Sequence, residues 1–450
     1  MKLGDHTYLG KNKVDPEGLD PEIKYIGLEH IGEGTLSLNG FGFASDVNSS
    51  KAVFEKGDIL FGKLRPYFRK VIIAPFDGIC STDIWVVKPK NGIDRNFLFY
   101  WMASQDFVDE VTRSSEGTRM PRAKWKVASK IEIPDVDIKT QKEIGEILYT
   151  LDQKIHLNQQ TNETLEAMAQ AMFKSWFVDF DPVRAKIEAN AEGHDPNRAA
   201  MAAIAGVSLE QDWDAIEAAL QQKLDRMSDT QRTQLRHTAE LFPDELVESE
   251  IGEVPKGWGV SEIGKEVNSV GGTTPRTKNP KYWDGGKIAW TTPKDLSNAN
   301  SKILLETDRK ITDEGLDQIS SGLLPINTVL MSSRAPVGYL ALSKIPVAIN
   351  QGYVAMICDQ ILTPEYVLHW TESNMDIIKQ HAGGSTFAEI SKRDFRPLPV
   401  LVPNKEVLNA YSDKAGSLYD LITANMNENK TLENIRDTLL PRLISGEIQI

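Results

Sequence analysis

Cysteine is nearly absent from this chain of 450 residues, which contains only Cys80 and Cys358. One lies in each half and neither belongs to a CxxC motif, so the sequence predicts neither a disulfide framework nor a cysteine zinc site. The seven histidines are scattered without metal-ligand spacing and suggest no histidine base. We expect both cysteines to be buried thiols, and we expect no metal site and no catalytic residue in the chain.

Long apolar runs are missing as well. No segment approaches the roughly 18 to 20 consecutive apolar residues that span a bilayer, and Met1–Asp5 does not open a signal peptide. Hydrophobic residues still make up 40% of the chain, which is enough for substantial cores in several domains. The sequence therefore predicts a globular protein of the cytoplasm with no membrane association.

Positive charge is in deficit, and the net charge of −13 argues at first against nucleic-acid binding. The acidic residues are unevenly distributed, however. Between Asp181 and Glu250 there are 15 acidic and 7 basic residues, so this stretch alone supplies −8 of the total. Basic clusters lie elsewhere, within 63–70, 119–130 and 276–287. Since a single basic cluster is more often a solvated surface, charge alone leaves DNA binding open.

The chain contains an internal repeat with a spacing near 268 residues. LFGKLRP at Leu60–Pro66 matches LMSSRAP at Leu330–Pro336. Further matches join Asp94 with Thr363 as helix caps, Trp101 with Trp370, and Ile131–Pro134 with Val400–Pro403. Each copy begins with short strand-like runs, such as 59–61 and 328–331, that a helix interrupts. The repeat predicts two compact α+β domains in a duplicated chain.

Each copy ends in a long helical segment with a heptad pattern. Seam positions, most of them apolar, alternate by four and three along the proline-free stretch 141–177. They are Ile144, Leu148, Leu151, Ile155, Asn158, Asn162, Leu165, Ala169, Met172 and Trp176. The pattern returns 267 residues later at Tyr411, Ala415, Leu418, Ile422, Asn425, Asn429, Leu432, Arg436, Leu439 and Leu443, where Arg436 is a poor seam residue. The pattern predicts a coiled coil.

Two asparagines interrupt each seam at matching positions, and such residues fix the register of a coiled coil. Each pair brackets the centre of its seam. An antiparallel alignment therefore places Asn158 beside Asn429 and Asn162 beside Asn425. A seam of 33 residues is about 50 Å long at about 1.5 Å per residue, which exceeds one turn of DNA. The alternative, that each helix packs only on its own domain, does not account for the matched asparagines.

Two segments resemble enzyme motifs but lack residues that those motifs require. GDILFGK at Gly57–Lys63 has the glycine and lysine spacing of a phosphate-binding loop, but Leu64 replaces the required Ser or Thr and Pro66 opposes a following helix. NPKY at Asn279–Tyr282 is similar to an amino-methyltransferase motif, but Lys281 replaces a proline. No glycine-rich turn suited to S-adenosylmethionine accompanies it. Neither motif predicts a catalytic site.

Several motifs together resemble the specificity subunit of type I restriction-modification systems. EVPKGW, GGTTP, YWDGG and IAW, at 253–258, 271–275, 282–286 and 288–290, resemble the opening of a target recognition domain. FKSWFVDFDP at 173–182 and LLPRLISGEI at 439–448 resemble the exits from the two spacer helices of that family. The first copy starts at Lys2–Asp5 without the preceding Pro-x-Gly-Trp, so the first domain is expected to be shortened or completed by another chain segment.

The resemblance implies an α+β fold with two target recognition domains on two long antiparallel coiled-coil spacer helices, related by an internal pseudo-twofold duplication. The implied order is a first recognition domain at 1–139, a first conserved spacer helix at 140–180, an acidic helical connector at 181–250, a second recognition domain at 251–404 and a second spacer helix at 405–450.

The resemblance also implies partners. A non-catalytic subunit of this kind recognises a bipartite target in double-stranded DNA and holds two modification subunits together with restriction subunits. No cofactor is expected in this chain; S-adenosylmethionine, ATP and Mg²⁺ belong to the partner subunits. Two alternatives stay open: a self-contained DNA methyltransferase or nuclease, and a coiled-coil scaffold without DNA contact.

Basic or hydroxyl side chains in matching loops form the expected DNA-facing set. Its members are Lys63, Arg65, Arg119, Arg122 and Lys124 in the first copy, and Thr274, Arg276, Lys278, Arg334, Ser385, Lys392 and Arg393 in the second. An arginine can read guanine with two hydrogen bonds or hold a phosphate. The sequence does not separate these two roles.

Overall fold

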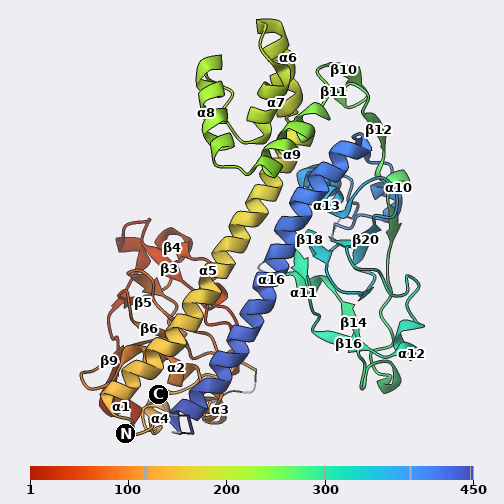
Figure 1. Cartoon of the computed structure of the whole chain (residues 1–450). Coiled ribbons are helices and arrows are strands. Elements are labelled where there is room, and N and C mark those ends of the chain that lie inside the picture. The colour runs from red at the N-terminus through yellow and green to blue at the C-terminus, as the bar shows by residue number, and fades with distance from the viewer. Residues whose placement is uncertain (116, 118, 298–300, 385–387, 446, 449–450) are drawn as a thin grey trace. The chain divides into compact units, whose positions relative to one another are not determined.

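The structure is a computed structural model of the full chain, and it describes residues 1–115, 117, 119–297, 301–384, 388–445 and 447–448 (Figure 1). The chain forms two compact units. Unit 1 consists of Met1–Asn158 and Asn427–Ile450, and unit 2 consists of Gln159–Met426. Two long helices, α5 (Ile138–Phe177) and α16 (Lys405–Ile444), each contribute one part to each unit.

Unit 1 contains two sheets of short strands. The order in the four-stranded sheet is β1 (Thr7–Leu9), β9 (Ile84–Pro89), β6 (Ile59–Gly62), β7 (Val71–Ile73). The order in the five-stranded sheet is β2 (Lys13–Val14), β5 (Lys51–Phe54), β8 (Gly78–Cys80), β3 (Lys24–Ile26), β4 (Gly42–Phe43). The helices of this unit, besides the long pair, are α1 (Leu3–His6), α2 (Arg95–Ala103), α3 (Gln105–Arg113) and α4 (Trp125–Ala128).

Strand β6 lies between two cores. Ile59 and Phe61 are fully buried in the core that includes α2 and the start of α5, whereas Leu60 is buried in a second core with Phe54 and Cys80. Alternate side chains of a strand point to opposite faces, so burial on both faces explains why the segment is uniformly apolar. The strand predicted at 59–61 is confirmed.

Helix α2 fixes the position of this domain on α5. The Asp94 carboxylate accepts a hydrogen bond from the Phe97 amide at 2.9 Å and so caps the helix, as predicted. Trp101 is buried in the same core as Ile144 and Leu148 of α5. The seam of α5 and the recognition domain therefore share one hydrophobic core within unit 1.

Unit 2 repeats this plan with more elements. Its larger sheet has the order β13 (Asn268–Val270), β20 (Tyr353–Ile357), β17 (Val329–Ser333), β18 (Val337–Ser343), β15 (Ile303–Leu304). The smaller sheets are β16 (Arg309–Ile311), β14 (Ile288–Thr291), β19 (Ala348–Ile349), then β10 (Leu246–Ser249) with β11 (Gly252–Pro255), and β12 (Gly259–Glu262) with β21 (Pro399–Val402). The accompanying helices are α10 (Ile263–Glu266), α11 (Pro293–Ser297), α12 (Asp313–Leu316), α13 (Pro364–Ser373), α14 (Met375–Gln380) and α15 (Lys392–Phe395).

Helix α13 is the counterpart of α2, and Trp370 is buried as Trp101 is. Thr363 is the N-cap residue of α13, as its position in the repeat predicts. Its buried hydroxyl makes no hydrogen bond to a described residue, so it lacks the side-chain cap that Asp94 provides. Cys80 is a buried thiol as predicted, whereas Cys358 is only half-buried.

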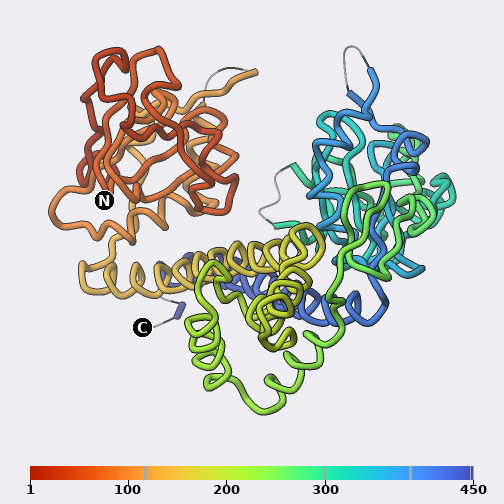
Figure 2. Tube along the Cα trace, turned by 90° about the horizontal axis from the view of Figure 1, so that it is seen from above, coloured from red at the N-terminus to blue at the C-terminus, as the bar shows by residue number. Residues whose placement is uncertain are grey.

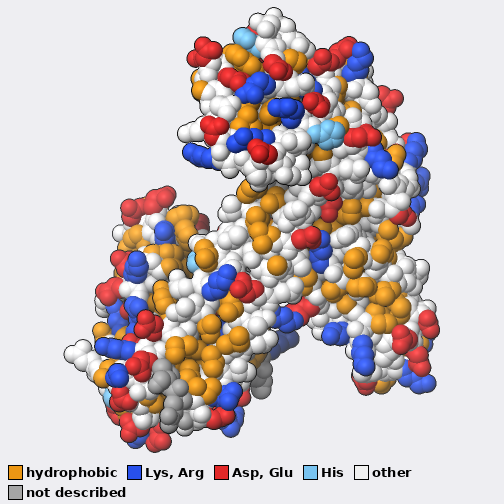
Figure 3. All heavy atoms as spheres, in the orientation of Figure 1, with side chains coloured by type: hydrophobic (Ala, Val, Ile, Leu, Met, Phe, Trp, Pro, Cys, Tyr) orange, Lys and Arg blue, Asp and Glu red, His pale blue; other side chains and the backbone are white. Residues whose placement is uncertain are grey.

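A helical segment connects the two repeats. It comprises α6 (Asp181–Glu192), α7 (Pro196–Ile204), α8 (Trp213–Asp225) and α9 (Asp229–Glu240). Buried alanines, including Ala185 and Ala199, let α6 and α7 pack closely. Figure 2 shows these helices as a group distinct from the sheets of unit 2. Acidic and basic side chains are interspersed on their surface (Figure 3).

The seam asparagines pair as the antiparallel alignment predicts. In unit 1 the Asn158 amide donates to Asn429 Oδ1 at 2.8 Å, and in unit 2 the Asn425 amide donates to Asn162 Oδ1 at 2.8 Å. Every predicted seam residue is buried or half-buried. Within the described part of the chain, none of the helices combines the length and the apolar character of a bilayer-spanning segment.

Candidate nucleic-acid interface

In unit 1 the interface is built where β6 ends. The Lys63 amide donates to the Asp83 carbonyl at 2.9 Å, and the Ala123 amide donates to the Lys63 carbonyl at 2.9 Å. The Arg65 amide donates to the Pro121 carbonyl at 2.8 Å. These backbone bonds hold the segment 63–65 beside 121–123, so two distant basic clusters of the sequence meet in one place.

Arg65 contacts the backbone of Arg119 within this loop pair. The Arg65 backbone is left-handed, with φ of 50°, and leads into a one-turn helix, η4 (Pro66–Phe68). Its guanidinium carbon lies 5.9 Å from the Phe68 ring centroid, and Nη2 donates to the Arg119 carbonyl at 3.4 Å. Lys124 follows directly as the residue before α4. The structure thus brings the five predicted residues of the first copy to one loop cluster.

Arg122 is held in a defined orientation by an acidic partner. Its Nε and Nη2 donate to the two Asp83 carboxylate oxygens, both at 2.9 Å. The hydrogen bonds from Arg122 are the main cause that lowers the pKa of Asp83. Because Asp83 uses only the Nε edge of the guanidinium, the Nη1 edge is directed away from this pair and can meet a guanine or a phosphate.

Unit 2 repeats the backbone scaffold with different side chains. The Ser333 amide donates to the Gly352 carbonyl at 2.8 Å, and the Ile390 amide donates to the Ser333 carbonyl at 3.0 Å. The second bond corresponds to the Ala123 to Lys63 bond of unit 1. Arg334 lies opposite Glu389, with 3.7 Å between Nη1 and Oε2.

The GGTTP loop reaches the same cluster. Gly272 approaches the Ile349 carbonyl so closely that a Cβ atom would lie 1.8 Å from its oxygen, which explains the glycine. The Thr274 hydroxyl donates to Gln351 Oε1 at 2.7 Å. Lys392 lies against the neighbouring Gly271. Thr274, Arg334 and Lys392 therefore surround one set of loops.

The remaining predicted residues of the second copy have other surroundings. The Arg276 carbonyl accepts a hydrogen bond from the Trp283 indole at 3.1 Å, and Arg309 covers the Trp283 ring at 3.5 Å from its centroid. Lys278 and Arg393 are exposed. Ser385 lies outside the described residues.

Among the described residues there is no group of three or more His, Cys, Asp or Glu side chains that could hold a metal ion. The phosphate-loop-like run ahead of Lys63 is the buried strand β6. An extended, buried strand does not offer a ring of free amides to a phosphate, so the failed motif match has a structural reason.

Comparison with known proteins identifies the family. The model of the type I restriction modification DNA specificity domain matches residues 20–167 and 255–434, one match in each repeat. The chain belongs to this type I DNA specificity family. The type I restriction enzyme HindI specificity subunit of Haemophilus influenzae is 31% identical over 417 residues, which cover 89% of this chain and 88% of that one.

Two further comparisons match part or nearly all of the chain. The MjaIX specificity subunit of Methanocaldococcus jannaschii is 36% identical over 194 residues, 42% of this chain and 44% of that one. The solved type I S subunit from M. genitalium is 14% identical, with a TM-score of 0.46, and the match covers 98% of this chain and 95% of that one.

In this specificity-family chain, sequence reasoning missed the acidic and amide partners of the basic residues. Asp83, Gln351 and Glu389 contact Arg122, Thr274 and Arg334, respectively. In the sequence, these three residues were marked only by their positions, which lie in or beside segments that align between the two repeats. None of the three is basic, and a search for phosphate-binding side chains passes over them.

Proposed function

We propose that the chain is the non-catalytic DNA specificity subunit of a type I restriction-modification complex, and that each recognition domain reads one half of a bipartite target in double-stranded DNA. One observation carries the proposal. The two units use the same backbone bonds, Ala123 to Lys63 and Ile390 to Ser333, to present different side chains. A common scaffold with different readers suits two different half-sites.

The DNA-facing residues divide into two expected roles. Arg122 and Arg334 are each oriented by a carboxylate, so they are the expected base readers. The other members of the set are the expected phosphate contacts: Lys63, Arg65, Arg119, Lys124, Thr274, Arg276, Lys278, Ser385, Lys392 and Arg393. Phosphate contacts raise affinity and fix orientation without reading sequence.

The helix pair is proposed to set the distance between half-sites and to carry the partner subunits. The asparagine pairs fix one alignment of α5 on α16 in each unit, which a fixed distance requires. The partners are two modification subunits, which supply S-adenosylmethionine chemistry, and restriction subunits, which use ATP and Mg²⁺. The chain itself supplies no cofactor, and its place is the cytoplasm.

The deciding experiment is methylation mapping of genomic DNA from cells that express the chain with its modification subunit. We expect one bipartite motif. Exchange of residues 1–138 for the first domain of another family member should change one half of the motif and leave the other intact. Two half-sites that change together would contradict independent reading by the two domains.

Two alternatives have distinct outcomes. Turnover of DNA by the purified chain alone would establish a self-contained methyltransferase or nuclease. Absence of salt-dependent binding to the mapped motif would establish a scaffold without DNA contact.

A further inference from the structure

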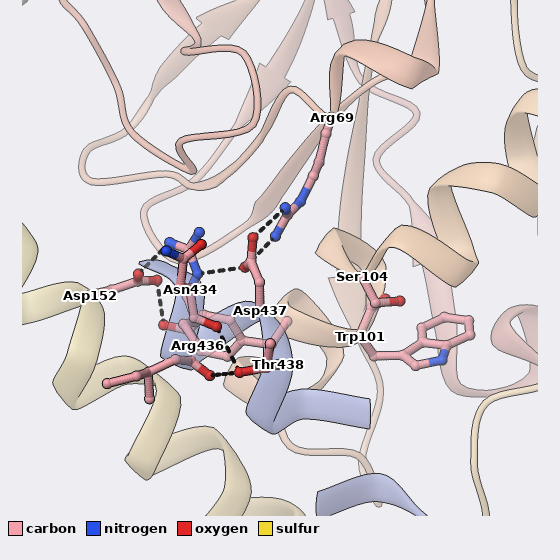
Figure 4. A network of polar contacts seen from close by, with 10 residues as sticks. Arg69, Trp101, Ser104, Asp152, Asn434, Arg436, Asp437 and Thr438 are labelled. Carbon is pink, nitrogen blue, oxygen red and sulfur yellow. Dashed lines mark hydrogen bonds and ion pairs between the residues drawn. The ribbon is translucent and has the colours of Figure 1, made fainter. Parts of the chain in front are cut away.

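A charged residue occupies the seam of the helix pair in unit 1. Arg436 is only 2% exposed, although heptad seam positions are normally apolar. Its Nη1 donates to Asp152 Oδ1 on α5 at 2.7 Å, and its Nε donates to Asp437 Oδ1 at 3.0 Å (Figure 4). The buried guanidinium therefore contacts a carboxylate from each helix.

The recognition domain contacts the same two carboxylates. Arg69 donates two hydrogen bonds to Asp437, from Nη1 to Oδ2 and from Nη2 to Oδ1, both at 2.8 Å. The Tyr100 hydroxyl of α2 donates to Asp152 Oδ2 at 2.7 Å. All four carboxylate oxygens are thus occupied. We call Arg69, Tyr100, Asp152, Arg436 and Asp437 the clamp.

The clamp is joined to the DNA-facing loop by a short, hydrogen-bonded turn. Arg65 and Arg69 bracket η4, and both have left-handed backbones with φ of 50°. The Phe68 amide donates to the Arg65 carbonyl at 3.0 Å, and the Arg69 amide donates to the Pro66 carbonyl at 2.9 Å. One end of the turn carries a candidate DNA contact, and the other end is fixed to the spacer helix.

We propose that the clamp is a positioning device: it fixes the DNA-facing loop of the first domain to the spacer helices and thereby sets the spacer length at which the first half-site is read. This inference rests on the proposed function. Arg69 acts here as a positioning residue, which contacts Asp437 rather than DNA. Two parallel hydrogen bonds to one carboxylate fix direction as well as distance, which a single contact does not.

The corresponding positions of unit 2 carry no seam charge. Ala169 is the counterpart of Arg436 and is fully buried. His369 and Tyr419 are the counterparts of Tyr100 and Asp152, and the Tyr419 hydroxyl lies 2.9 Å from His369 Nε2 in a buried contact. Reading of the second half-site should therefore not depend on a charged residue in the helix seam.

The test measures methylation by the full chain with its modification subunit on a library of targets whose half-sites are separated by spacers of different length. For Arg69→Gln we expect the preference for the best spacer over its neighbours to fall by about tenfold, equivalent to about 1.4 kcal/mol. Both half-site sequences should stay the same. Arg69→Lys keeps the positive charge but not the two parallel hydrogen bonds. Its spacer preference should lie between that of the original chain and that of Arg69→Gln.

Lys88→Gln is the matched control. Lys88 pairs with Glu55 at 2.7 Å and with Asp58 at 3.3 Å inside the same domain, without a contact to the spacer helices among these partners. It should keep the spacer preference of the original chain.

The outcomes separate the clamp from the proposed function. An original chain with no bipartite preference overturns the proposed function and the clamp with it. A selective original chain together with an equally selective Arg69→Gln overturns the clamp alone. If Arg69→Gln does not fold, Tyr100→Phe decides, because it removes one hydroxyl and keeps the ring; unchanged selectivity in that variant overturns the clamp.

Discussion

Arg334 offers the sharpest single-residue test of DNA reading. Its ion pair with Glu389, 3.7 Å long, orients the guanidinium in the loop that corresponds to the Lys63 loop. Arg334→Ala should weaken binding to the mapped target by about 1 to 3 kcal/mol and relax the preference at one base pair of the second half-site. Titration of labelled duplexes at a fixed salt concentration measures both effects.

Two controls distinguish lost DNA reading from loss of folding or loss of the ion pair alone. Thermal unfolding of Arg334→Ala should match the original chain, since the side chain lies at the surface. Glu389→Gln should keep the base preference more nearly intact because the arginine remains. Unchanged affinity and unchanged target for Arg334→Ala would remove this residue from the reading set.

Asp437 makes folding stability sensitive to acid. Burial opposes its ionisation, but the hydrogen bonds from Arg69 and the charges of Arg436 and Arg69 outweigh burial and lower its pKa. Its pKa in the folded chain is therefore below the ordinary value of about 3.9. The ionised carboxylate stabilises the fold at pH values above about 4, and this contribution is lost as the pH falls further.

Denaturant unfolding of the original chain and of Asp437→Asn should show this dependence. The original chain should be more stable near neutral pH, and the difference between the two free energies of unfolding should shrink as the pH falls from about 4 toward 3. A difference that stays constant over this range would mean that folding does not lower the pKa of Asp437.

Residue-level contacts were predictable only where a geometric rule joined the partners. The heptad rule predicted the Asn158 to Asn429 pair because an antiparallel alignment fixes which seam positions face each other. No such rule joins Arg69 to Asp437, which are 368 residues apart. In the sequence, Arg436 was notable only as a poor seam residue. The other clamp residues come from α5, α16 and the recognition domain, and they meet only when the domain packs on both helices.

At the scale of helices, a double-mutant cycle on Asn158 and Asn429 measures how strongly the two buried side chains interact. Asn158→Leu leaves Asn429 Oδ1 without its hydrogen-bond donor in the seam, so this variant should lose about 1 to 3 kcal/mol of unfolding free energy. Asn158→Leu with Asn429→Leu removes both polar groups and should recover that loss or exceed the original stability.

Chemical denaturation of the four proteins in the cycle measures the coupling. The Asn162 and Asn425 pair of unit 2 supplies a parallel cycle with the same geometry. Additive effects of the two leucines would contradict a direct interaction between the asparagines.

Elements were predicted best where one physical signal dominated. The buried strand β6 and the long helices followed from apolar patterns that persist over the whole element. The many short strands did not: β15 and β19 have two residues each, too few to show a period. Their positions depend on pairing with β18 and β14, which only the folded chain provides.

At the scale of the whole molecule, helix length should control the spacer in the DNA target. Seven residues inserted into both α5 and α16 between the asparagines and one domain keep the seam on the same face. The helical path should lengthen by about 10 Å, equal to about 3 base pairs of DNA. Methylation mapping of the lengthened chain should show a longer spacer between unchanged half-sites.

Insertion in α5 alone is the matched control, because it shifts the two seams against each other and should abolish the fixed alignment. Full activity at the original spacer with both insertions present would show that these helices do not set the distance. Loss of all methylation by a folded protein would point to rotation, since 3 base pairs turn the groove by roughly 100°.

Because the two native thiols should react slowly, cysteines introduced elsewhere can be labelled to measure the distance between the two domains. Burial raises the pKa of Cys80 to about 12 and raises the pKa of Cys358 well above its ordinary range, so both stay protonated near neutral pH. The native chain should therefore react slowly with maleimide labels. A pair of cysteines introduced at exposed positions outside the DNA-facing set, Lys126→Cys and Gln318→Cys, could carry fluorophores for energy transfer. Energy transfer between the two labels would then show, in solution, whether the distance between the two domains changes when DNA is added.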